Sequence, residues 1–100
     1  MTDETNLKPP TIHLDISQEV SHGKYANLVL SNATPEEFIL DFAFLQPGNL
    51  KAQVLQRTIL SPRNAKRLCA LLQRNITDFE SQFGIISDEP QRPGITLSFN

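Results

Sequence analysis

The chain has 100 residues, of which 39% are hydrophobic and 20% are charged, and its formal net charge is −2. This size and composition fit one folded domain and exclude an extensively disordered protein. No run approaches the ~20 apolar residues that span a bilayer, the acidic start is unlike a secretory signal, and one cysteine allows no intrachain disulfide. We therefore expect a cytoplasmic protein without a membrane partner.

The charges are segregated along the chain. No acidic residue lies between Asp41 and Asp78, whereas six basic residues do, and all eleven acidic residues fall outside that stretch. The protein is therefore expected to be bipolar, with a basic middle and acidic flanks.

The first half of the chain carries the signals of β-strands. Residues 1–10 end in two prolines and are expected to form a flexible arm. Residues 11–16 alternate apolar with polar side chains, which predicts a first strand. After a turn at 21–24, residues 25–31 are expected to form a second strand.

Two further strands are predicted, at 38–45 and at about 51–60, and turn residues at 46–50 join them. Both strands place apolar side chains on their two faces, so alternation alone does not fix their register.

A long helix follows. Ser61 is a hydroxyl N-cap, Pro62 suits the first helical position, and Gly84 is a C-terminal stop. The helix over 62–83 would be roughly 33 Å long. Its apolar side chains cover about 80° of the helical wheel. We call these residues the apolar stripe: Ala65, Leu68, Leu72, Ile76, Phe79 and Phe83.

These elements predict an α+β fold. The expected architecture is an antiparallel sheet of four strands, or five if 95–99 adds a short strand, followed by one long amphipathic helix packed on one sheet face. The single domain would cover 11–86, between the arm at 1–10 and a tail at 87–100.

The sequence offers little for catalysis or metal binding. His13 and Asp15 share a strand face, but two ligands do not make a metal site. Cys69 lies near the edge of the apolar stripe and is expected to be a small buried hydrophobe. No glycine-rich phosphate loop is present. We predict a protein that is not an enzyme and that needs no metal or cofactor.

The helix face opposite the stripe is basic and forms the candidate site for an anion or a partner. Its charges oppose the helix dipole, because basic residues crowd the N-terminal half while Asp78 and Glu80 lie near the C-terminal end. A salt bridge to Glu36, Glu37 and Asp41, within the chain or across a dimer, is one explanation. Plain solvation and an anionic partner, either nucleic acid or an acidic protein, are the others. We call these residues the basic face: Arg63, Lys66, Arg67 and Arg74.

Four motifs resemble a family of small bacterial proteins that is catalogued as a domain of unknown function. The resemblance covers roughly residues 11–86 and implies no activity. The order of strands and helix is also similar, as a fold-level analogy, to the SecB-type export chaperones. The motifs are Gly23-x-Tyr25-Ala26-Asn27, Glu37-Phe38-x-Leu40-Asp41-Phe42, Ser61-Pro62-x-x-Ala65-Lys66-Arg67-Leu68 and Asn75-Ile76-x-x-Phe79-Glu80-x-x-Phe83-Gly84-x-Ile86.

One helix can cover only one face of a sheet whose strands are apolar on both sides. A homodimer or higher homo-oligomer is therefore expected. The function predicted is a self-associating, protein-binding module with a holdase-like or chaperone-like action; the alternative is an adaptor that binds nucleic acid or another anionic partner through the basic face. The candidate oligomer interface consists of Ile39, Leu45, Leu55 and Ile59.

Overall fold

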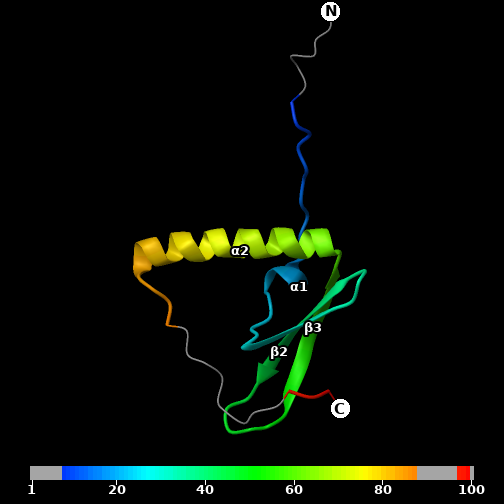
Figure 1. Ribbon diagram of the computed structural model, residues 1–100, viewed down its shortest axis with the longest axis vertical. Helices are drawn as coiled ribbons and strands as arrows, with labels where there is room; N and C mark the ends of the chain where they lie inside the picture. The colour runs from blue at the N-terminus through cyan, green and yellow to red at the C-terminus, as the bar shows by residue number, and fades with distance from the viewer. Residues whose placement is uncertain (1–7, 88–96, 100) are drawn as a thin grey trace, which may run out of the picture. The chain divides into compact units, whose positions relative to one another are not determined.

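The computed structural model describes residues 8–87 and 97–99 and contains a three-stranded antiparallel sheet and a long helix (Figure 1). The strands follow one another in the order β1-β2-β3, so β2 is central. The predicted α+β class, with strands before a C-terminal helix, is confirmed. The elements are α1 (Gln18–Ser21), β1 (Leu28–Ala33), β2 (Phe38–Leu45), β3 (Ala52–Leu60) and α2 (Pro62–Phe83).

The predicted strand at 11–16 does not form within the chain. Its apolar residues Ile12, Leu14 and Ile16 are 80%, 91% and 67% exposed. A strand needs a neighbour as well as an alternating pattern. Here the following residues begin α1, because the Ser17 hydroxyl accepts a hydrogen bond from the Val20 N–H at 3.1 Å. The sheet of four or five strands is therefore not confirmed.

The possible strand at 95–99 lies partly outside the described residues. Residues 97–99 are described and carry no strand. The Phe99 ring instead lies 5.7 Å from the guanidinium carbon of Arg57, in a cation–π contact.

Asn27 and Thr34 mark the two ends of the β1–β2 pairing. The Asn27 side chain donates to the Leu45 carbonyl at 2.9 Å and accepts from the Leu45 N–H at 2.8 Å, so one amide satisfies both backbone groups. At the turn, the Thr34 hydroxyl accepts from the N–H groups of Glu36 and Glu37 at 3.2 and 3.1 Å. The predicted second strand at 25–31 is therefore shifted to Leu28–Ala33.

The most deeply buried residues lie on the central strand. Asp41 and Ala43 are the two buried residues found among 8–87 and 97–99, and Asp41 has a polar or electrostatic partner. The predicted strands at 38–45 and 51–60 are confirmed as β2 and β3. In the turn between them, the Asn49 N–H donates to the Gln46 carbonyl at 3.0 Å and Gly48 has a φ of 78°. That φ value favours glycine.

The predicted limits of α2 are confirmed at both ends. The Ser61 hydroxyl accepts from the Asn64 N–H at 3.2 Å, and the Gly84 N–H donates to the Glu80 carbonyl at 2.9 Å. No residue of α2 is buried, and within the apolar stripe only Ala65 and Leu68 are half-buried. The expected packing of the helix on one sheet face is not confirmed. Among the described helices, none combines the length and apolarity needed to cross a membrane.

The chain divides into two compact units, each of which contains part of every strand. Unit 1 combines Met1–Val29 with Asp41–Gln56, and unit 2 combines Leu30–Leu40 with Arg57–Asn100. The segment with α1 belongs to unit 1, and α2 belongs to unit 2. Two candidate surfaces can therefore be described separately, one in each unit.

Replacement of Asn27 by alanine should lower the free energy of unfolding by about 1–2 kcal/mol, because two hydrogen bonds to Leu45 are lost from a solvent-exposed site. Chemical denaturation followed by circular dichroism measures the change. Asn32→Ala is the matched control, since the Asn32 side chain makes no hydrogen bond within the described part of the chain. Equal losses in the two variants would contradict the role given to Asn27.

Candidate functional site

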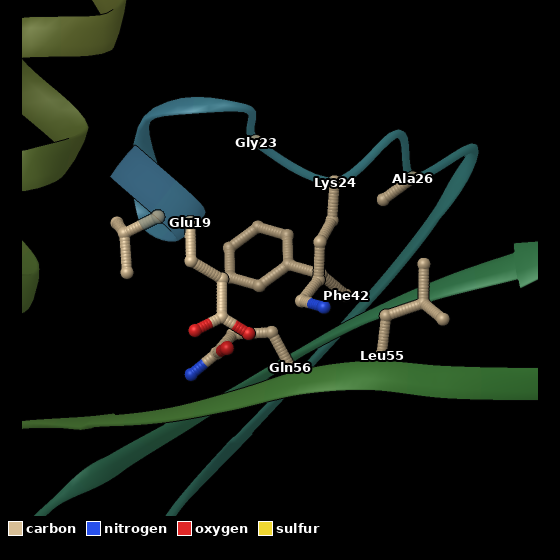
Figure 2. Close-up of a pocket in the computed structure, with 8 residues that line it drawn as sticks. Glu19, Gly23, Lys24, Ala26, Phe42, Leu55 and Gln56 are labelled. Carbon is tan, nitrogen blue, oxygen red and sulfur yellow. The ribbon is translucent and has the colours of Figure 1, made fainter. Parts of the chain in front are cut away.

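Unit 1 contains a pocket of about 450 Å³ between the α1 segment and the sheet (Figure 2). Phe42 of β2 and Leu55 of β3 supply its apolar sheet side, and Ala26 adds a small apolar group. The Glu19 carboxylate and the Lys24 ammonium group lie at the same pocket from the α1 segment. No ion pair joins these two charges.

The segment that forms the pocket wall is fixed at several points. Ser17 caps α1 at its start, and the Gly23 N–H donates to the Val20 carbonyl at 3.0 Å. Gly23 has a φ of 72°, a left-handed conformation that favours glycine. The ring of Tyr25 then meets that of Phe44 edge to face, with centroids 6.3 Å apart. The wall therefore has a defined path from α1 to β1.

The pocket was not foreseen from the sequence. Gly23 and Ala26 of the motif Gly23-x-Tyr25-Ala26-Asn27 line the pocket, so this motif is the signal in the sequence that corresponds to it. In the structure, Gly23 forms a left-handed turn, the Tyr25 ring contacts Phe44 and the Ala26 methyl group lines the pocket. Asn27 bonds to the β2 backbone through its side chain. Chemically, the pocket suits an apolar group that has polar or charged atoms beside it.

Unit 2 presents the apolar stripe of α2 to solvent over most of its length. Leu72, Ile76, Phe79 and Phe83 are 50%, 39%, 47% and 67% exposed. The rings of Phe79 and Phe83 lie 4.9 Å apart, centroid to centroid, so they form one aromatic surface. Leu71, beside the stripe, is also exposed. This is a contiguous apolar surface of the kind that marks an interaction site.

The basic face is exposed as well. Arg63, Lys66, Arg67 and Arg74 all lie on the surface of α2, and none of them forms an ion pair or a hydrogen bond through its side chain with residues 8–87 or 97–99. The proposed intrachain salt bridge to the acidic patch is therefore wrong for the described part of the chain. One member of that patch, Asp41, is completely buried and so is not a surface acid.

The residues expected at an oligomer interface are divided between the two units. Leu45 and Leu55 belong to unit 1, and Ile39 and Ile59 belong to unit 2. Only Ile59 is exposed, whereas the other three are half-buried and Leu55 lines the pocket. Their place in an interface stays a prediction, but the larger exposed apolar surface is on α2.

The other candidate groups are dispersed. His13 and Asp15 are exposed, and in the described ranges no three His, Cys, Asp or Glu side chains gather as a metal site would require. Cys69 is exposed, so the expectation of a buried thiol is wrong. The reason is that the stripe beside Cys69 is itself largely uncovered.

Comparison with known proteins adds a family but no activity. No curated protein and no solved structure matches the chain, so the analogy with SecB-type chaperones has no structural support. A family model described as "Protein of unknown function (DUF3467)" matches residues 1–88, which includes the arm that the motifs alone did not cover. The chain therefore belongs to this DUF3467 family, as the four motifs had indicated.

Proposed function

We propose that the protein is a cytoplasmic, non-enzymatic module that associates with itself and binds other protein chains. The observation that carries this proposal is the distribution of apolar side chains. Among the described residues, Ala43 is the only buried hydrophobic one, while the α2 stripe faces water. The partner we assign to the stripe is a second copy of the same chain.

The energetics of folding support a second copy. Ordering each residue costs roughly 1–2 kcal/mol of backbone entropy, and burial of apolar surface is the main compensation. Aromatic side chains present about 150–250 Å² each, so the exposed parts of Phe79 and Phe83 leave on the order of 200 Å² uncovered. At about 25 cal/mol per Å², covering this surface would contribute ~5 kcal/mol per chain. Association would thus supply stability that one chain lacks.

The charge pattern of α2 favours an antiparallel pair of helices. In one chain, the basic residues lie toward the positive end of the helix dipole and the acidic residues toward its negative end, which is unfavourable. An antiparallel neighbour places the negative dipole end of one helix beside the basic half of the other. The same charges then become favourable.

The positions of the charged residues define a common centre for this pair. Lys66 and Glu80 lie on one side of the apolar stripe and Arg67 and Asp78 on the other, at about 100° per residue. A two-fold axis across two antiparallel helices brings the same side of each helix together. Lys66 and Glu80 are symmetric about position 73, and Arg67 and Asp78 about 72.5, so a single axis pairs both sets.

The pocket in unit 1 supports the binding of other protein chains. Its apolar side, formed by Phe42 and Leu55, suits an aliphatic or aromatic side chain. Glu19 and Lys24 offer an acceptor and a donor for the polar backbone that accompanies such a side chain. A holdase-like activity would use the pocket in this way.

Phe79→Asp should convert the homo-oligomer into monomers, because it places a charge in the apolar stripe. Light scattering coupled to size exclusion at tens of micromolar measures the mass. Ser81→Asp is the matched control, since it adds the same charge on the opposite face of α2. A wild-type monomer under these conditions would remove the proposal.

Charge exchange tests the antiparallel orientation. Lys66→Glu should weaken the dimer by about 1–2 kcal/mol, because each of two symmetric pairs becomes repulsive and surface pairs are worth up to ~1 kcal/mol. Adding Glu80→Lys to the same chain should restore the affinity. Sedimentation equilibrium at low salt gives the dissociation constants. If the double variant is weaker than Lys66→Glu alone, the two residues do not face each other.

A second function is favoured by the basic face, which lacks ion pairs within the described residues. Such a face suits an anionic partner, including nucleic acid. The stretch that carries it contains no aromatic residue on which a base could stack, which favours charge-based contacts. This adaptor function would use Arg63 and Arg74, which lie opposite the stripe and outside the proposed dimer pairs, so both functions are compatible in one dimer.

Reversing Arg63, Arg67 and Arg74 to glutamate separates the two functions. If the basic face binds single-stranded nucleic acid, the triple variant should lose binding to a labelled oligonucleotide, and its salt dependence should fall by about two units of slope. A double variant that reverses only Arg63 and Arg74 should keep the wild-type oligomeric mass, because these two residues lie opposite the stripe and outside the proposed Arg67–Asp78 pairs. No measurable binding of the oligonucleotide by the wild type would eliminate this alternative.

A further inference from the structure

We infer that residues 11–16 form an exchanged strand, which adds to the outer edge of β3 in a second copy of the chain. The inference rests on the proposed self-association and gives it a second contact, in unit 1, separate from the α2 stripe in unit 2. Three observations support it: a strand pattern without a strand neighbour, a sheet edge without a second strand among the described residues, and complementary charge.

The donor segment has the pattern of a strand but no strand neighbour. Ile12, Leu14 and Ile16 alternate with polar residues, and all three are largely exposed. No backbone hydrogen bond ties residues 8–16 to the rest of the described chain. The segment ends at Ser17, where the cap of α1 fixes its C-terminal end. A partner sheet edge would satisfy its backbone groups and cover its apolar side chains.

The acceptor edge is β3. It has β2 as its neighbour in the three-stranded sheet, so its other side is an edge within the described residues. It is nine residues long and contains neither proline nor glycine, and its Val54 side chain is exposed. Long, uninterrupted edge strands pair readily with another chain unless they are covered. The other edge, β1, is shorter and ends in Ser31-Asn32-Ala33.

Charge and connectivity favour a second copy as the donor. Asp15 is the only acid or base apart from His13 in 11–16, whereas the basic residue Lys51 directly precedes β3. The donor segment and Ala52–Gln56 belong to the same compact unit of one chain. Residues 11–16 could therefore pair with Ala52–Gln56 without leaving their own unit. The structure nevertheless has no strand at 11–16. In an exchange between two copies, each copy would donate its residues 11–16 to the partner and would accept the partner's segment on its own β3 edge.

Disulfide trapping between two separate variants tests the exchange. Both carry Cys69→Ser; one adds Val54→Cys, and the other adds Ile12→Cys, Leu14→Cys or Ile16→Cys. Cross-strand neighbours on one face have Cβ atoms close enough for a disulfide. After the two proteins are mixed and oxidised, at least one apolar position should give about tenfold more heterodisulfide than His13→Cys, which points to the other face.

Equal yields from His13→Cys and the apolar positions, or no heterodisulfide from any of them, would overturn the exchanged strand. The outcome is independent of α2. A dimer that is lost in Phe79→Asp but gives no heterodisulfide supports the proposed function without the exchange. Heterodisulfide formation that persists in the Phe79→Asp background supports the exchange without the helix pair.

Discussion

Burial of apolar surface is the constraint on which the rest of this structure depends. The central strand holds the two most buried side chains, and one of them, Asp41, is polar. Ala43, the buried apolar one, is among the smallest hydrophobic residues, so it contributes little to the free energy of folding. The hydrogen bonds that shape the hairpins orient the chain, but each contributes only about 1 kcal/mol net. The proposed association would add a further apolar contribution from surfaces that one chain leaves open.

The α2 helix shows how this constraint and electrostatics act together. Its ends are defined by local interactions, at Ser61 and at Gly84, so the helix forms at a fixed place in the sequence. Its stripe and its charges, in contrast, are unfavourable for an isolated chain: the stripe faces water and the charges oppose the dipole. Both features become favourable beside an antiparallel copy. An antiparallel pair of α2 helices would therefore account for both the exposed stripe and the charges that oppose the helix dipole.

The parts of the fold that could be predicted from the sequence are those with local causes. The cap at Ser61 and the stop at Gly84 fixed α2 to the residue, and β2 and β3 had strong apolar patterns and a clear turn between them. The strand predicted at 11–16 does not form within the chain. Alternation of apolar and polar residues indicates a preference for extended structure, but it does not indicate which strand would lie beside it. The exposure of Cys69 could not be predicted for a related reason. The helical wheel shows that Cys69 lies beside the apolar stripe, but whether it is buried depends on what packs against that side of the helix.

The candidate pocket shows the same limit at a finer scale. Nothing in the spacing of Gly23, Tyr25 and Asn27 reveals that a glycine turn, a ring contact and an amide clamp act on one short segment. Once these contacts exist, the α1 segment leads directly from Ser17 to the pocket, and residues 11–16 precede Ser17. If a second copy holds residues 11–16, it restrains the chain entering the pocket wall. Self-association and binding at the pocket would then be thermodynamically coupled, with each favouring the other.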